Sequence, residues 1–173
     1  EDGMPISELS AIIESVRDTA IAADVKIVAG DTKVVGKGEA DRLFINTAGV
    51  GVIERAPVSI KNVRPGQKII LSGFIGNHSI HLLSLREGLG FERNILSDCA
   101  PLNAMIHQLI DAVPAGKIAS MRDVTRGGLS AVLHEHARAA KHEMRCERQS
   151  LPIQPETAMA ANMLGVDVIN LAN

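Results

Sequence analysis

Aromatic residues are scarce in this sequence of 173 residues, which has no tryptophan or tyrosine and only three phenylalanines. Hydrophobic residues still make up 46% of the chain, so we expect a packed core, in one domain or two small ones, rather than disorder. The chain also lacks an initial methionine and ends in an apolar run, residues 168–173. A longer protein cut at both ends would have these features, and we therefore expect a fragment.

A strong charge, a long apolar run and a cysteine motif are missing as well. The formal net charge is −2, which gives no reason to expect binding to nucleic acid or to a membrane surface. No apolar run approaches the roughly 20 residues that a bilayer span needs, and the acidic start is unlike a signal peptide. The two cysteines, Cys99 and Cys146, form no C-x-x-C pair, so a reduced, cytoplasmic setting fits best.

Apolar periodicity and turn residues predict the elements of secondary structure. Helices are expected near residues 8–23, 77–88, 102–113, 128–140 and 155–164. Strands are expected at residues 25–29, 43–53, 68–73, 117–121, 144–147 and 166–171. This order lacks a regular β-α-β alternation and favours an α+β fold. Proline and glycine in residues 55–67 mark a boundary between two domains, residues 1–56 and 57–173.

Residues 121–129, M-R-D-V-T-R-G-G-L, join a short apolar run to a periodic helix. A helix start has unpaired N–H groups and the positive end of the helix dipole, which favour an anion such as phosphate. Gly127 and Gly128 permit close approach of a ligand or of another backbone, and Arg126 supplies positive charge. Asp123 either caps the helix or helps to hold a metal ion. A capped helix start without a ligand explains the pattern equally well.

Asp31 and Lys33, in G-D-T-K-V-V, share one face if their segment is extended, because Thr32 separates them. The carboxylate then suits Mg²⁺, and the ammonium group suits a phosphate oxygen. An ion pair at the edge of a strand is the alternative, and from these residues alone it is favoured.

Two histidines and two cysteines are further candidates. His78 and His81 lie at i, i+3 on a predicted helix, but no third metal ligand is evident, so packing or capping is favoured. Cys146 has no evident histidine partner and is expected to be structural. Cys99 stays open, because a helix N-terminus favours a thiolate.

Four segments together resemble the family of the hydrogenase maturation protein HypE. They are G-D-T-K-V-V at residues 30–35, S-D-C-A-P-L at 97–102, M-R-D-V-T-R-G-G-L at 121–129 and L-G-V-D-V-I-N-L-A-N at 164–173. Their order and spacing match, and the similarity covers essentially the whole chain. The wider superfamily includes aminoimidazole ribonucleotide synthetase, selenophosphate synthetase and thiamine-monophosphate kinase.

The resemblance implies an α+β, aminoimidazole ribonucleotide synthetase-like two-domain fold, truncated here at both ends. Residues 1–56 would be the C-terminal part of an N-terminal ATP-binding and dimerisation domain, and residues 57–173 a C-terminal α+β domain that is incomplete at its end. It also implies a cytoplasmic homodimer, with or without exchanged elements, that binds ATP and Mg²⁺ between subunits and domains. The implied partners are the carbamoyltransferase HypF and the HypC–HypD scaffold.

In this family, ATP activates the amide oxygen of a carbamoyl group carried by a C-terminal cysteine. Loss of phosphate leaves a thiocyanate, from which cyanide passes to the iron of nickel–iron hydrogenases. Neither Cys99 nor Cys146 occupies the position of that cysteine, so we assign no catalytic residue and expect this chain alone to be inactive. Another ATP-dependent synthetase or kinase of the superfamily, or a non-catalytic docking module for maturation partners, remains an alternative.

The resemblance also implies the site residues. Asp31 matches the acid that helps to hold Mg²⁺ with ATP, and Thr32 and Lys33 lie where phosphate or nucleotide contacts are expected. The phosphate-side loop of the second domain is matched by Asp123, Thr125, Arg126, Gly127 and Gly128. Asp98 matches the neighbouring S-D-C loop. Where the family usually has G-D-H-G, this chain has G-N-H-S at residues 76–79, so an acidic role there is lost.

Overall fold

The computed structural model describes residues 1–53 and 58–173. The chain forms two compact units. Unit 1 consists of Glu1–Arg55 with Pro101–Ala112, and unit 2 of Ala56–Ala100 with Val113–Asn173. The domain boundary expected between residues 56 and 57 falls outside the described residues, so the two predicted domains remain a prediction.

The expected helices are confirmed. In the part of the chain that the structure describes, the α-helices are α1 (Ile6–Ala22), α2 (Asn77–Glu87), α3 (Asn103–Ala112), α4 (Gly128–Ala140) and α5 (Pro155–Leu164). Short 3₁₀ turns are η1 (Ile60–Asn62), η2 (Phe91–Arg93), η3 (Arg148–Ser150) and η4 (Val168–Asn170). None of the described helices is long and apolar enough to cross a bilayer.

The expected strands do not form. No residue within 1–53 or 58–173 belongs to a strand, and backbone contacts between distant segments are isolated, as between Ser59 N and Ala119 O at 2.9 Å. A strand is stabilised by a ladder of hydrogen bonds to a neighbour, and an apolar β-branched segment without one stays irregular. The described residues therefore contain the helices of the expected α+β class but not its sheet.

The strand expected at residues 166–171 is replaced by η4. Asp167 begins this turn, because its carboxylate accepts a hydrogen bond from Ile169 N over 3.3 Å. Its backbone oxygen also accepts one from Asn170 N over 3.0 Å. An aspartate that bonds to nearby backbone groups competes with extended structure, and here the local turn is formed.

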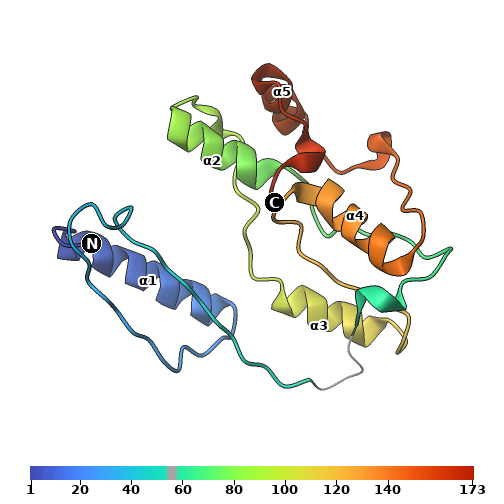
Figure 1. Ribbon diagram of the computed structural model, residues 1–173, viewed down its shortest axis with the longest axis horizontal. Coiled ribbons are helices and arrows are strands. Elements are labelled where there is room, and N and C mark those ends of the chain that lie inside the picture. Colours follow the sequence, from blue (N-terminus) through green and yellow to red (C-terminus); the bar gives the residue numbers. More distant parts are fainter. Residues whose placement is uncertain (54–57) are drawn as a thin grey trace. The chain divides into compact units, whose positions relative to one another are not determined.

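Unit 2 contains the hydrophobic core. Helix α4 packs against η4 and η1, and α2 packs against η2 and α5 (Figure 1). The buried core residues are Ile75, Ile80, Ile95, Leu129, Ala160, Ala161 and Val168. The core is thus aliphatic, and it holds the start of α2, the start of α4 and the segment around η4 together.

Unit 1 has no buried residue among those described. The apolar stripe expected along α1 meets no core, since Ile13 is 58% exposed and Val16 is 40% exposed. Helix α3 is attached through Asn103 Nδ2, which donates to Ala23 O over 2.8 Å. Unit 1 therefore leaves apolar side chains in contact with water that a packed domain would cover.

Candidate functional site

The loop before α4 joins two of the expected site residues. Thr125 Oγ1 donates a hydrogen bond to Asp123 Oδ2 over 2.7 Å, and Arg122 Nε lies 3.7 Å from Asp123 Oδ1. The Thr125 bond is the largest cause of a lowered pKa at Asp123; the backbone N–H of Asp123 and the Arg122 charge act in the same direction, and burial opposes them. The Asp123 side chain is 67% exposed, so an ionised carboxylate is available to a cation.

Two glycines form the start of α4. Gly127 is the N-cap residue with φ of 74°, and no side chain caps the helix. The capping role considered for Asp123 is therefore wrong, because its carboxylate is bound to Thr125 instead. Gly128 also has a positive φ, 65°, and a Cβ there would lie 2.5 Å from Ile169 O. The close approach expected at Gly128 is made by protein backbone.

Arg126 extends the same loop with a positive charge. It is exposed and has no hydrogen bond or ion pair with any residue that the structure describes. Arg122, by contrast, pairs with Glu135 on α4, with 3.4 Å between Nη2 and Oε2. The loop thus offers one guanidinium group that is not already neutralised by a described carboxylate.

Asp98 lies in a different turn of unit 2. Its Oδ1 is buried and has no hydrogen-bond partner in the described part of the chain. Beside it, Cys99 N donates to Ser97 Oγ over 3.3 Å. A buried acceptor without a donor costs about 1–3 kcal/mol, so Asp98 is a place where a donor from a ligand is favourable. No contact between described side chains connects Asp98 with Asp123 or Thr125.

Asp31, Thr32 and Lys33 belong to unit 1 and are exposed. Asp31 Oδ1 accepts a hydrogen bond from Thr32 N over 2.9 Å. Lys33 forms no ion pair with Asp31 or with any other described residue, so the ion-pair alternative is not formed. The segment is not a strand either, and its acid and lysine remain open to a ligand.

Asn173, the last residue of the L-G-V-D-V-I-N-L-A-N segment, makes structural contacts that the sequence patterns did not predict. Its Oδ1 accepts from Gly76 N over 2.6 Å, and its Nδ2 donates to Phe74 O over 2.8 Å. Its backbone N donates to Val124 O over 2.8 Å. Asn173 therefore connects the G-N-H-S segment with the loop that carries Asp123, and no periodicity or short motif predicts such a contact.

The G-N-H-S segment is fixed by a second polar contact. Asn77 is 4% exposed; its Oδ1 accepts from Thr157 Oγ1 over 2.6 Å, and its Nδ2 donates to Gln154 Oε1 over 3.0 Å. Ser79 Oγ donates to Ala172 O over 2.7 Å. The asparagine that stands in place of the usual family aspartate is therefore a satisfied structural residue that joins α2 to α5.

The histidines of α2 are engaged by protein groups. His81 Nδ1 lies 2.8 Å from Ile95 O, and His78 Nδ1 lies 2.9 Å from Ser97 Oγ. The described residues contain no group of three or more histidine, cysteine, aspartate or glutamate side chains that could hold a metal ion. The packing or capping role favoured for these histidines stays a prediction, and both rings contact protein groups.

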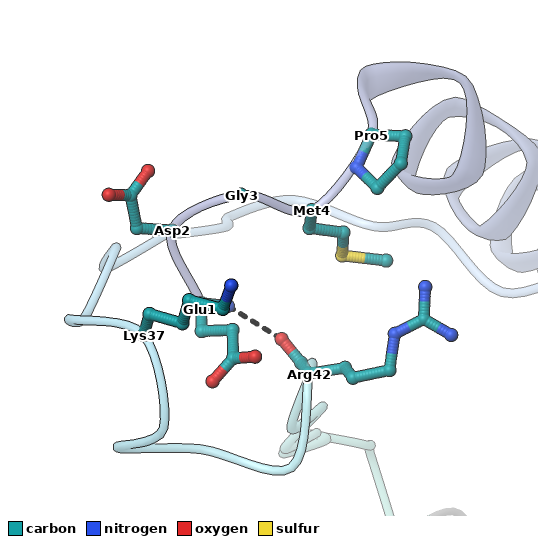
Figure 2. Close-up of a pocket in the computed structure, with 7 residues that line it drawn as sticks. All are labelled: Glu1, Asp2, Gly3, Met4, Pro5, Lys37 and Arg42. Atoms are coloured by element: carbon teal, nitrogen blue, oxygen red, sulfur yellow. Dashed lines mark hydrogen bonds between the residues drawn. The ribbon is translucent and has the colours of Figure 1, made fainter.

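Two cavities lie apart from the expected site residues. In unit 1 a cavity of about 100 Å³ is lined by residues 1–5, Lys37 and Arg42, where Glu1 N donates to Arg42 O over 2.6 Å (Figure 2). In unit 2 a cavity of about 430 Å³ lies beside Arg148 and Asn162. Neither is lined by Asp31, Asp98 or Asp123, so neither is the pocket expected from the sequence.

Comparison with known proteins identifies the family. The family model for the C-terminal domain of AIR synthase related proteins matches residues 64–170. The hydrogenase expression/formation protein HupE of Azotobacter chroococcum mcd 1 is 42% identical over 174 residues, which span 100% of this chain and 50% of the relative. The carbamoyl dehydratase HypE of Escherichia coli strain K12 is 41% identical over 177 residues, which span 100% of this chain and 51% of the relative.

Solved structures give the same result. Escherichia coli HypE has a TM-score of 0.92 and 39% identity, with 99% of this chain and 53% of that chain covered. A HypE–HypF complex has a TM-score of 0.87 and 38% identity, and the match covers 99% of this chain and 56% of that chain. HypE in complex with ATP has a TM-score of 0.85 and 31% identity, and the match covers 99% of this chain and 51% of that chain. The chain spans about half the length of these relatives.

These likenesses supply what the described helices alone do not. A TM-score of 0.92 over 99% of the chain confirms the expected aminoimidazole ribonucleotide synthetase-like fold, although the described residues form no β-sheet. The chain therefore belongs to the AIR synthase related family and, within it, is a relative of the hydrogenase maturation protein HypE.

Proposed function

We propose that this chain is the ATP-binding part of a carbamoyl dehydratase that acts in the maturation of nickel–iron hydrogenases. The observation that carries the proposal is the Asp123–Thr125 contact at the glycine start of α4, in a chain 41% identical to a carbamoyl dehydratase. A solved relative bears ATP. Because the chain spans half of these relatives, ATP binding is proposed for the chain and the dehydration for the whole protein.

In unit 2 the phosphate side of ATP is assigned to the loop before α4. Its members are Asp123, Thr125, Arg126, Gly127 and Gly128. The start of α4 carries no side-chain cap, and of its first N–H groups that of Gly128 donates to Thr125 O over 3.0 Å. The next N–H groups and the positive end of the helix dipole favour an anion. Arg126 adds a full charge. Asp98, with its unpaired buried oxygen, is assigned to a donor group of the ligand.

In unit 1 we assign Asp31 to Mg²⁺, and Thr32 and Lys33 to phosphate or nucleotide contacts. Protein-bound Mg²⁺ usually keeps several waters and takes one or two carboxylates together with phosphate oxygens. A metal of this kind needs no cluster of three protein ligands. The lack of a three-ligand cluster among the described residues therefore does not conflict with a metal ion that arrives with the nucleotide.

The chemistry explains why a nucleotide is needed. An amide oxygen is a poor leaving group, and the phosphoryl group of ATP makes it a good one. The residues of this chain hold the phosphate in position and offset its negative charge. In the proposed whole protein, a segment other than this chain contributes the carbamoylated cysteine.

HypF is the proposed partner, because a relative with a TM-score of 0.87 was solved with it. The HypC–HypD scaffold is proposed to receive the product. We also propose a homodimer, supported by the apolar side chains that unit 1 leaves exposed, such as Phe44 and Val52. A cytoplasmic setting is supported by the two free thiols, Cys99 and Cys146.

Isothermal titration with ATP and Mg²⁺ tests the proposal. We expect saturable binding, weakened about tenfold or more by Arg126→Ala or Lys33→Ala, because each removes a charge-assisted contact. Arg145→Ala and Lys26→Ala are the matched controls, since both residues are exposed and stand outside the proposed site. Absence of binding with Asp31 and Lys33 intact rejects ATP binding by this chain.

A docking module is the second candidate, favoured by the HypE–HypF structure. It predicts that HypF binds this chain with equal affinity whether or not Lys33 and Arg126 are intact. The ATP proposal predicts loss of nucleotide binding in the same variants. A third result, ATP binding without HypF binding, favours another synthetase or kinase of the superfamily.

A further inference from the structure

Cys99 lies beside an imidazole ring. Its Sγ is 3.4 Å from His78 Nδ1, and the same ring nitrogen is 2.9 Å from Ser97 Oγ. Both residues belong to unit 2: His78 is half-buried on the first turn of α2, and Cys99 is exposed. An exposed thiol with a fixed base at this distance has the two groups that nucleophilic catalysis by cysteine requires.

Ser97 keeps the pair in place. Its Oγ accepts a hydrogen bond from Cys99 N over 3.3 Å while it also contacts His78 Nδ1. One hydroxyl group therefore contacts both the imidazole ring and the backbone of Cys99, which places the two residues side by side.

A second observation concerns the residue that precedes Cys99. Asp98 precedes Cys99, and its Oδ1 is buried without a hydrogen-bond partner among the described residues. A ligand with an N–H donor and a positive charge satisfies this acceptor and is attracted by the carboxylate. A resident metal ion is a poorer match, because the described residues offer no third ligand beside the cysteine and the histidine.

We propose that Cys99 and His78 form a thiol–imidazole pair and that Cys99 undergoes thiol–disulfide exchange with small amine-bearing disulfides. The Cys99 thiol gives its proton to His78 Nδ1, and Sγ attacks one sulfur of the disulfide. The S–S bond of the reagent breaks and a new S–S bond forms on Cys99. The leaving thiolate takes the proton from the imidazolium, so the products are a mixed disulfide and one free thiol.

The second cysteine is a built-in control. Cys146, expected from the sequence to be structural, is in fact exposed and free, and it has no histidine or other hydrogen-bond partner among the described residues. Exposure alone therefore does not distinguish the two thiols, whereas the imidazole does. The exchange itself needs neither ATP nor a carbamoyl group, so its failure would leave the proposed function untouched, although Asp98 also belongs to the proposed nucleotide site.

The test uses single-cysteine variants and cystamine, an amine-bearing disulfide. Cys146→Ser leaves Cys99, and Cys99→Ser leaves Cys146; the mixed disulfide is followed by mass spectrometry. We expect Cys99 to react at least about tenfold faster than Cys146, since a positioned base accelerates such steps by this factor or more. Adding His78→Gln should bring Cys99 down to the rate of Cys146 and leave Cys146 unchanged.

Two further variants separate the contribution of the Asp98 carboxylate from that of the His78 imidazole. Asp98→Asn should slow Cys99 toward cystamine but not toward the uncharged bis-hydroxyethyl disulfide. Ser97→Ala perturbs the ring by another route if the glutamine variant fails to fold, and it should also reduce the advantage of Cys99. Equal rates at the two cysteines in otherwise unaltered chains overturn the proposal, as does an undiminished Cys99 rate in a folded His78→Gln variant.

Discussion

Thr125 Oγ1 donates its hydrogen bond to Asp123 Oδ2, and this single contact is the main reason why the pKa of Asp123 is lowered. A carboxylate held in its ionised form repels phosphate unless a cation lies between them. The threonine therefore does more than orient the loop. It favours the ionised form of Asp123, which is the form that attracts a cation, and this effect matters in acid, where an unassisted carboxylate takes up a proton.

The first prediction concerns this pair. Thr125→Val removes the donor, so the pKa of Asp123 should rise toward its ordinary value, and Thr125→Ser should leave it low. Because the pKa is lowered in the folded protein, the contact stabilises the fold above the unfolded-state pKa and is lost as the pH falls through the folded-state pKa. Titration of the carboxyl carbon by NMR measures both variants, and identical titrations in Val and Ser would contradict this account.

Gly128 and Gly165 provide a matched pair of glycines. Both have positive φ, 65° and 68°, but a Cβ on Gly128 would lie 2.5 Å from Ile169 O, while a Cβ on Gly165 meets nothing within 4 Å. Gly165→Ala should cost about 1–2 kcal/mol of unfolding free energy, from backbone strain alone. Gly128→Ala should cost at least about 2 kcal/mol more, because backbone cannot yield easily. Urea denaturation of the two variants decides; equal losses would mean that the contact with η4 is absent.

Arg148 and Asp167 form a two-pronged ion pair, with 3.1 Å from Nη1 to Oδ2 and 3.0 Å from Nη2 to Oδ1. Arg148 is the largest cause of the lowered pKa of Asp167. Stabilisation by the pair is therefore present at neutral pH and lost as the pH falls through the folded-state pKa. Arg148→Gln should lower stability slightly at pH 7, since both groups are exposed, and the difference should vanish in acid. A pH-independent difference in urea denaturation would point to lost packing instead.

Thr157 is fully buried and donates to Asn77 Oδ1. Thr157→Val keeps the shape of the side chain but leaves that oxygen with no donor from α5. The expected loss is about 1–3 kcal/mol of unfolding free energy. Thr47→Val, at an exposed position, is the control and should change stability by no more than about 0.5 kcal/mol. If Thr157→Val is as stable as the control, Asn77 is satisfied by another group.

The helices were predictable because their signals are local. Pro155 and Gly165 bracket α5 in the sequence as they do in the structure, where Gly165 ends the helix with a positive φ. Gly127 likewise marks the start of α4. The strands were not predictable in this way, because a strand requires a partner, and residues 43–53 meet none among the described residues.

The candidate site was predictable only in part. The Asp123 loop and the exposed Asp31 segment follow from short motifs. The contacts of Asn173 with Phe74 and Gly76 span 99 and 97 residues, and no local pattern encodes a pairing over such a distance. The Cys99–His78 pair was missed for the same reason, since 21 residues separate its members.

The contacts of residues 168–173 also bear on how unit 2 folds. Asn173 forms hydrogen bonds with Phe74, Gly76 and Val124. The backbone of residues 169–171 packs against Gly128. The starts of α2 and α4 are therefore completed by a segment that lies 40 or more residues further along the chain. Contacts between segments so far apart in sequence close long loops, and we therefore expect them to form late in the folding of unit 2.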